Sequence, residues 1–133
     1  REFILVRKEN EDDIVITQND IREVQLAKGA IAAGIRIMLS KLGYEVFQID
    51  KVIVAGAFGN FIDKESAVTI GILPDVPLDN IVSAGNTAGA GVLMSVVNRS
   101  EASEVQLIPE KIRHIELAAE PDFQDVYMRE MGF

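Results

Sequence analysis

The sequence of 133 residues contains no cysteine. Disulfide bonds, cysteine-ligated zinc and cysteine-ligated iron–sulfur clusters are therefore excluded within these residues. His114 is the only histidine, so a cluster of histidine ligands is excluded too, and we interpret this side chain as structural. The acidic run from Glu9 to Asp13 lacks the alternating spacing and central glycine of a calcium loop. We expect no metal site and no catalytic set of residues in this sequence.

Long apolar segments are missing as well. No stretch reaches the ~18 uncharged apolar residues of a membrane span, and the longest candidate helix, 20–42, is interrupted by Lys28 and Arg36. No basic start leads into an apolar segment with a small-residue cleavage site, as a secretory signal would. We therefore expect no membrane partner, and the lack of cysteine is compatible with a cytoplasmic protein.

Positive charge is scarce. The 13 basic residues are outnumbered by 21 acidic residues, which gives a net charge of −8. Sequence-independent binding to a phosphate backbone needs a basic face. We therefore expect no nucleic-acid partner, and we interpret the acidic surface as a source of solubility.

Apolar residues are plentiful, at 48% of the sequence, and the length fits one domain with one core. The sequence begins with Arg1, and the following "EFILV" is already strand-like. We expect residues 1–133 to be a single domain that is a fragment of a longer protein.

The first third of the sequence predicts a hairpin and a long helix. Two β-branched, apolar runs, Phe3 to Val6 and Ile14 to Thr17, flank a charged connection. A helix over 20–42 follows, with Thr17 as its cap and Asp20 as a weak capping-box partner. Gly43 is a suitable stop for this helix. The apolar residues recur every three or four positions, at Val24, Ala27, Ile31, Ile35, Met38 and Leu42.

Two buried strands alternate with helices in the middle of the sequence. Asp50 to Ala55 is apolar on both faces, as in the middle of a parallel sheet, and Ile81 to Ala84 is the second such strand. Asp63 caps a short helix that ends at Gly71. A further helix follows the second strand, and Asn86 or Thr87 can cap it.

The last third carries three further segments. "SEASEVQLIPEKI" looks helical, but Pro109 interrupts it. "HIEL" is a candidate edge strand, and "PDFQDVYMREM" is a last helix with Pro121 near its first position. The order of hairpin, helix, strand, helix, strand and helix predicts an α/β layered domain whose later strands are parallel.

Two glycine-bearing turns follow the buried strands, in "VIVAGAFGNF" (52–61) and "IVSAGNTAGAG" (81–91). Glycine permits positive φ and leaves no side chain in the way of a ligand. The helix N-terminus that follows offers free N–H groups, and ligands of open α/β sheets sit outside such strand ends. Neither turn is a P-loop or a dinucleotide fingerprint. On spacing alone, tight helix–strand packing and nucleotide contact both stay open.

Other residues near these turns have simpler interpretations. Asp50, Asp63 and Asp75 lie near strand or helix ends and are interpreted as caps or turn residues. Phe58 and Phe61 flank the first turn. Either a cover over a ligand or a buried staple would explain them.

Four blocks of the sequence, in this order, resemble the C-terminal part of the ATP-dependent reductive activators of corrinoid proteins. They are "ITQNDIREVQLAKGAIAAGI", "VIVAGAFGNFIDKESAVTIGILPDVP", "VSAGNTAGAGVLM" and "HIELAAEPDFQDVYMREMGF". The resemblance covers residues 14–133. A continuous helix is expected where Pro109 lies, so this position departs from the resemblance.

The resemblance implies a fold and an activity. Whole members of that family carry an N-terminal plant-type [2Fe–2S] ferredoxin-like domain, a linker, a middle domain and a C-terminal ATPase. The ATPase belongs to the superfamily of acetate and sugar kinases, heat-shock chaperones and actin, and it drives the reduction of cob(II)alamin to cob(I)alamin. This chain would be the last lobe of that ATPase. Its expected fold is an actin-like, ribonuclease-H-like lobe, a mixed sheet with an N-terminal hairpin, parallel later strands and helices on both faces.

The resemblance also implies a binding site. "VIVAGAFGN" matches the adenosine-binding turn of the superfamily, with Ala57 in place of a second glycine. The expected nucleotide-binding residues are Gly56, Ala57, Phe58, Gly59, Asn60, Gly85 and Asn86. ATP with magnesium would bind in the whole protein, and the [2Fe–2S] cluster and the catalytic residues would lie on parts outside this chain. We expect this lobe to be inactive alone, to hold no nucleotide tightly, and to serve a corrinoid protein or its methyltransferase.

Two alternatives remain open. The chain could act as a dimerisation or interaction module, with the small-residue helix 20–42 or the tail 118–133 as its contact surface. It could also be a lobe of a kinase-like phosphotransferase of the same superfamily. That function would need acceptor-pocket residues that we do not find here.

Overall fold

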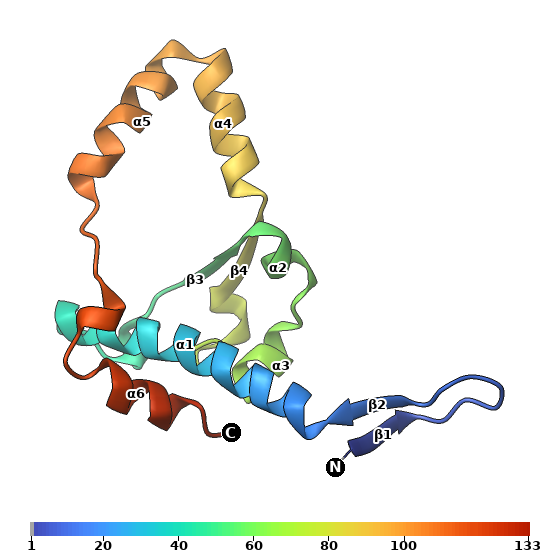
Figure 1. Cartoon of the computed structure of the whole chain (residues 1–133). Coiled ribbons are helices and arrows are strands. Elements are labelled where there is room, and N and C mark those ends of the chain that lie inside the picture. Colours follow the sequence, from blue (N-terminus) through green and yellow to red (C-terminus); the bar gives the residue numbers. More distant parts are fainter. Residues whose placement is uncertain (1) are drawn as a thin grey trace.

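The computed structural model describes residues 2–133, apart from the side chains of Phe58 and Glu101. The chain forms a hairpin, a central α/β body and a helical arm (Figure 1). In chain order, the helices and strands are β1 (Glu2–Val6), β2 (Ile14–Thr17), α1 (Gln18–Leu42), η1 (Val46–Gln48), β3 (Val52–Ala55), α2 (Gly56–Phe61), α3 (Lys64–Thr69), η2 (Leu78–Asn80), β4 (Ile81–Gly85), α4 (Thr87–Val97), α5 (Arg99–Lys111), η3 (Leu117–Ala119) and α6 (Phe123–Glu130).

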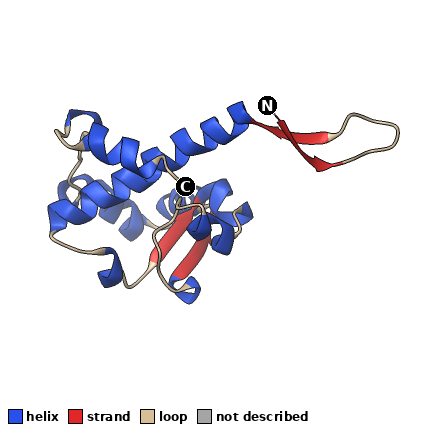
Figure 2. Ribbon diagram, turned by 90° about the horizontal axis from the view of Figure 1, so that it is seen from below, coloured by secondary structure: helices blue, strands red, loops and turns tan. Residues whose placement is uncertain are grey.

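The predicted hairpin is present. Strands β1 and β2 pair antiparallel, and their register runs from Glu2 opposite Thr17 to Val6 opposite Ile14. Figures 1 and 2 both show the hairpin projecting from the body at the start of α1. Its apolar side chains are largely exposed, with Phe3 at 68%. The hairpin therefore contributes little to the core of this chain.

Helix α1 begins with the predicted capping box. The Thr17 hydroxyl accepts a hydrogen bond from the Asp20 backbone N–H at 3.2 Å, and the Asp20 carboxylate accepts one from the Thr17 backbone N–H at 2.8 Å. The Thr17 hydroxyl also donates to the Asp20 carboxylate at 2.8 Å, and the pKa of Asp20 is lowered first by the bond from the backbone N–H and then by this one. The helix ends at Gly43, whose φ of 71° is left-handed. Local chemistry alone accounts for both ends.

The small residues of α1 allow close contact with the C-terminal part of the chain. A side-chain carbon added at Gly29 would lie 2.8 Å from Cγ of Met131, and one at Gly34 would lie 3.3 Å from Cδ1 of Leu117. The segment that packs closely against these glycines is α6 with its flanking residues. This face of α1 is therefore occupied within the chain.

Polar contacts fix the same pairing. Arg36 forms an ion pair with Glu130, and Lys41 forms one with Glu120 at 2.8 Å. Lys28 is only 5% exposed. Its ammonium group donates to the Gly132 carbonyl and lies 5.1 Å from the centre of the Phe133 ring. The C-terminal tail therefore contacts α1 from Glu120 to Phe133.

Strands β3 and β4 form the parallel pair that the sequence predicts. The register runs from Val52 opposite Ile81 to Ala55 opposite Gly85. The core lies against one face, where Ala67, Leu73, Val76 and Ile81 are buried and Val52 and Val54 pack on them. Among the described residues, the hairpin and the parallel pair are two separate two-stranded sheets.

The second face of the parallel pair is exposed. Side chains alternate between the faces of a strand, so Ile53 and its partner Val82 share the side opposite the core. Ile53 is 63% exposed and Val82 is 38% exposed. Among the described residues, the helices cover one face of β3 and β4, and the side chains of Ile53 and Val82 on the other face stay exposed.

Two expectations for the last third are wrong. Helix α5 runs without a break from Arg99 to Lys111 through Pro109. Because Pro109 lies two residues before the helix end, its missing N–H removes one hydrogen bond there and leaves the earlier turns intact. "HIEL" is not a strand, since neither ladder of the described residues includes it and its last residue begins η3. The predicted last helix is present as α6, beginning two residues after Pro121.

Candidate functional site

The two glycine turns lie side by side at the carboxyl ends of β3 and β4. Ala55, the last residue of β3, is opposite Gly85, the last residue of β4. Helix α2 begins at Gly56 directly after β3, and α4 begins at Thr87 after Asn86. The structure thus brings together two sequence segments that are about thirty residues apart. This is the edge of a parallel sheet where ligands of α/β folds bind.

Gly56 and Gly85 are required by the backbone and leave open space. Their φ angles are 87° and 65°, a left-handed conformation that side chains with a Cβ rarely adopt. A Cβ at Gly56 would meet nothing within 4 Å, and one at Gly85 would have the Asn60 Oδ1 as its nearest neighbour at 3.8 Å. These two glycines therefore shape a surface that a ligand can approach closely.

Gly59 has a different role. A Cβ at this position would lie 2.7 Å from the carbonyl oxygen of Val54, which is backbone and cannot move aside. The glycine therefore allows α2 to pack directly on β3. The spacing of the glycines alone left helix–strand packing and ligand contact both open. The structure assigns packing to Gly59 and open space to Gly56 in the same turn.

Ser83 connects the first turn to β4, and sequence reasoning missed it. Its hydroxyl lies 2.8 Å from the Gly59 carbonyl and 3.1 Å from the Asn60 Oδ1, and it donates toward both. The available signal was a single hydroxyl in an otherwise apolar strand, "IVSAG". This contact links α2 to β4 and places Asn60 between the two glycine turns.

Asn86 is engaged in capping. Its side-chain Oδ1 accepts a hydrogen bond from the Gly89 backbone N–H at 3.0 Å, which confirms the predicted cap of α4. Ala57 and Asn60 are exposed on α2. Phe61 is 88% exposed, so it is not a buried staple. The side chain of Phe58 lies outside the described residues.

Asp63, a carboxylate near the site, has a structural role. Asp63 caps α3, as predicted, and its carboxylate accepts hydrogen bonds from the hydroxyl and the backbone N–H of Ser66. The hydroxyl first and the backbone N–H second lower the pKa of Asp63. Within the described residues, no three acidic or histidine side chains come together as a metal site.

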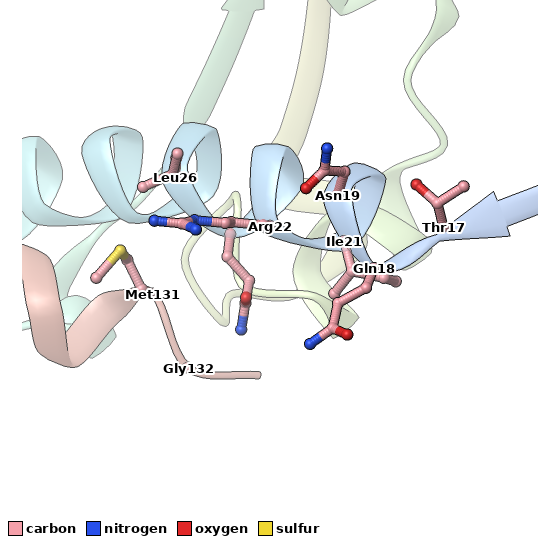
Figure 3. Close-up of a pocket in the computed structure, with 9 residues that line it drawn as sticks. Thr17, Gln18, Asn19, Ile21, Arg22, Leu26, Met131 and Gly132 are labelled. Carbon is pink, nitrogen blue, oxygen red and sulfur yellow. The ribbon is translucent and has the colours of Figure 1, made fainter. Parts of the chain in front are cut away.

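A groove lies elsewhere, along the first turns of α1 (Figure 3). This groove has a volume of about 820 Å³, and Met131 and Gly132 of the tail form its other wall. Thr17, Asn19 and Arg22 give it a polar lining. It includes none of the glycine-turn residues and no strand end of the parallel pair.

The described helices include none that is long and apolar enough to cross a membrane.

The family model of the C-terminal domain of RACo, the ASKHA domain, matches residues 1–133. The chain belongs to this family. The corrinoid activation enzyme RamQ of Eubacterium limosum is 40% identical to it over 121 residues. A [Co(II) methylated amine-specific corrinoid protein] reductase of Methanosarcina barkeri is 30% identical over 122 residues. The resemblance inferred from four sequence blocks is confirmed.

A solved structure agrees with the fold. The chain of a reductive activator for corrinoid, iron–sulfur protein matches with a TM-score of 0.84 and 35% identity, over 98% of this chain. The actin-like fold class is thereby confirmed for this member of the RACo C-terminal family. The alignments cover 91% and 90% of this chain but only 20% and 22% of the two curated relatives, and 21% of the solved chain. The chain thus spans about a fifth of their length.

Proposed function

We propose that this chain is the C-terminal, nucleotide-binding lobe of a longer ATP-dependent activator that reduces cob(II)alamin to cob(I)alamin in a corrinoid protein. The observation that carries the proposal is the pairing of Ala55 with Gly85, which sets two open glycine turns side by side. The RACo-family relatives, a corrinoid activation enzyme and a corrinoid protein reductase, support a corrinoid protein as partner. A cytoplasmic location is part of the same proposal.

ATP fits the residues present. Gly56 and Gly85 leave free the volume that a Cβ would fill, so the ribose or the inner phosphates can approach the backbone. Ala57 and Asn60 are exposed beside that volume, and Asn86 sets the start of α4. Gly59 contributes indirectly by seating α2 on β3. ATP bound there supplies the free energy for an uphill electron transfer.

The other cofactors need residues from elsewhere. A [2Fe–2S] cluster does not fit this chain, because the sequence has no cysteine. Magnesium would reach the site with ATP, since the described residues offer no cluster of carboxylates for it. A second lobe would close the other side of the nucleotide, so we propose that this lobe alone binds ATP weakly and reduces nothing.

The experiment compares two glycines with the same backbone constraint. Gly56→Val and Gly43→Val both force a branched side chain into left-handed φ, at 87° and 71°, and both Cβ atoms enter space that is empty within 4 Å. Gly43 ends α1, away from the strand ends. ATP affinity of the full-length activator should fall at least about tenfold in Gly56→Val and stay unchanged in Gly43→Val, although backbone strain costs both a similar ~1–2 kcal/mol.

Unchanged ATP affinity in a folded Gly56→Val protein would remove the site assignment. Equal losses in both variants would show that strain, and not the position of Gly56, lowers the affinity. Gly56→Ala is a milder second variant that adds only one methyl group. Failure of cob(I)alamin formation with normal ATP binding would leave the site intact and overturn the proposed activity alone.

A further inference from the structure

The hydroxyl of Ser83 lies between the two glycine turns. Ser83 is opposite Val54 in the register of β3 and β4. Its Oγ donates toward the Gly59 carbonyl at 2.8 Å and toward the Asn60 Oδ1 at 3.1 Å. Both acceptors belong to α2, the helix that begins at the end of the neighbouring strand. A side chain of β4 therefore holds the element that shapes the first turn.

The two contacts of Ser83 fix the same residue. The Gly59 carbonyl is part of the peptide group that joins Gly59 to Asn60. One contact therefore fixes the backbone of Asn60, and the other fixes its side chain. A hydroxyl carries a single proton, which these two acceptors share. Gly59 lies in the last turn of α2, where carbonyls lack partners inside the helix, so Ser83 supplies a donor that α2 does not have.

The second glycine turn lies next to the same amide group. A Cβ at Gly85 would lie 3.8 Å from the Asn60 Oδ1, so this oxygen faces both Ser83 and Gly85 of β4. The other end of an asparagine amide is a nitrogen with two N–H donors. Because the oxygen is turned toward β4, the nitrogen is turned away from it. Such donors match the ribose and phosphate oxygens of ATP, which accept hydrogen bonds.

We propose that Ser83 is a positioning residue of the nucleotide site and acts by orienting Asn60. Ser83 holds the Asn60 amide before the nucleotide arrives, so less side-chain entropy is lost on binding. All the contacts that carry this role lie between β4 and α2. They do not depend on what another part of a longer protein places over the turns. The role rests on the proposed function, because it belongs to the proposed nucleotide site.

The experiment removes the Ser83 hydroxyl from the full-length activator and measures ATP binding with magnesium by isothermal titration calorimetry. Ser83→Ala should lower the ATP affinity about fivefold, as expected for one net hydrogen bond. Ser83→Thr keeps a hydroxyl on a side chain that suits a strand, and it should bind ATP like the wild type. Ser95→Ala is the matched control, because the Ser95 hydroxyl donates to the Gly91 carbonyl, also at 2.8 Å, within α4. This control should leave the ATP affinity unchanged.

A double-mutant cycle separates orientation of Asn60 from a general effect on the fold. Asn60→Ala removes the amide that Ser83 orients, and it should itself weaken ATP binding. If Ser83 acts through Asn60, the loss caused by Ser83→Ala should disappear in the Asn60→Ala background. Ser83→Ala and Ser95→Ala each remove a hydroxyl–carbonyl bond of the same length. A cause that lies in the whole fold would therefore lower the affinity of both.

Three results would each overturn the role of Ser83. They are unchanged ATP affinity in Ser83→Ala, an equal loss in Ser95→Ala, and additive losses in the double variant with Asn60→Ala. Ser83→Cys keeps the size of the side chain but offers only a weak S–H donor, so it replaces Ser83→Ala if that variant does not fold. A loss of ATP affinity in Gly56→Val but not in Ser83→Ala would overturn this role alone. Unchanged affinity in both would overturn the nucleotide site itself.

Discussion

The chain contains two helix pairs that differ in how much of their apolar surface is buried. Helices α1 and α6 meet through small residues and are fixed by two ion pairs and the buried Lys28. Helices α4 and α5 meet each other and little else, and α4 exposes large apolar side chains. Among the described residues, the first pair is packed against its partner, whereas α4 of the second pair stays exposed.

Side-chain size explains the difference. Glycine at positions 29 and 34 allows a neighbouring segment to approach the helix backbone, so the contact can close inside one chain. The valines and leucine of α4 protrude instead, and they need a surface of their own kind. The chain thus contains one helix surface that is packed internally and another that is exposed among the described residues.

The largest expected effect comes from breaking the internal interface. Gly29→Val places atoms within 2.8 Å of Met131 and 3.3 Å of the Tyr127 ring, so unfolding should become easier by about 3 kcal/mol. Ala30→Val on the neighbouring, exposed position should cost only about 0.5 kcal/mol through helix propensity. Urea unfolding followed by far-UV circular dichroism measures both. Equal costs would contradict the close packing of α1 on α6.

The next effect concerns the buried cation of that interface. Lys28→Met leaves the Gly132 carbonyl without its hydrogen-bond donor, and the loss should be about 2 kcal/mol. Lys41→Met removes a more exposed partner of Glu120 and should cost no more than about 1 kcal/mol. Urea midpoints give the ranking. A larger loss at Lys41 would show that the tail is held by its ion pairs and not by Lys28.

A smaller effect is expected where the helical arm of α4 and α5 begins. Asn86→Ala removes the acceptor for the Gly89 N–H and should destabilise the protein by about 1 kcal/mol. Asn86→Ser keeps a capping oxygen and should restore most of the loss. Thermal unfolding of the two variants provides the comparison. No difference between them would mean that the cap does not hold α4 in place.

The smallest effect is a dependence on pH. The folded pKa of Asp20 is lowered by its hydrogen bonds with Thr17, so this carboxylate stabilises the fold above its unfolded pKa of about 3.9. That stability is lost as the pH falls through the lower, folded value. Asp20→Asn should flatten this part of the stability curve. Thr17→Val should flatten it less, because the backbone N–H of residue 17 remains and is the larger cause.

The parts predictable from sequence are those set by neighbouring residues. The capping box of Thr17 and Asp20 and the stop at Gly43 depend on contacts within four positions, and both are confirmed. Asn86 or Thr87 was expected to cap α4, and the structure shows Asn86. The apolar pattern also located both parallel strands. Failures arose where distant contacts decide, as in "HIEL", which finds no strand beside it among the described residues.

The candidate site shows the same division. The sequence located both glycine turns but could not say which glycine serves which purpose, because the clash of Gly59 with Val54 and the openness at Gly56 appear only in three dimensions. Ser83 was missed because its partners, Gly59 and Asn60, lie more than twenty positions away. The nucleotide assignment itself stays a prediction until affinity is measured.

A single residue separates Gly85 from α4, so the end of β4 sets the direction in which the arm begins. The helix has 11 residues, so at about 1.5 Å per residue its far end lies about 16 Å from the pivot, and a rotation of about 10° moves that end by about 3 Å. The pivot is the strand end opposite Ala55, beside Gly56 and the hydroxyl of Ser83. Because α5 leads back to the body at η3, such a rotation would have to be accommodated at both ends of the arm.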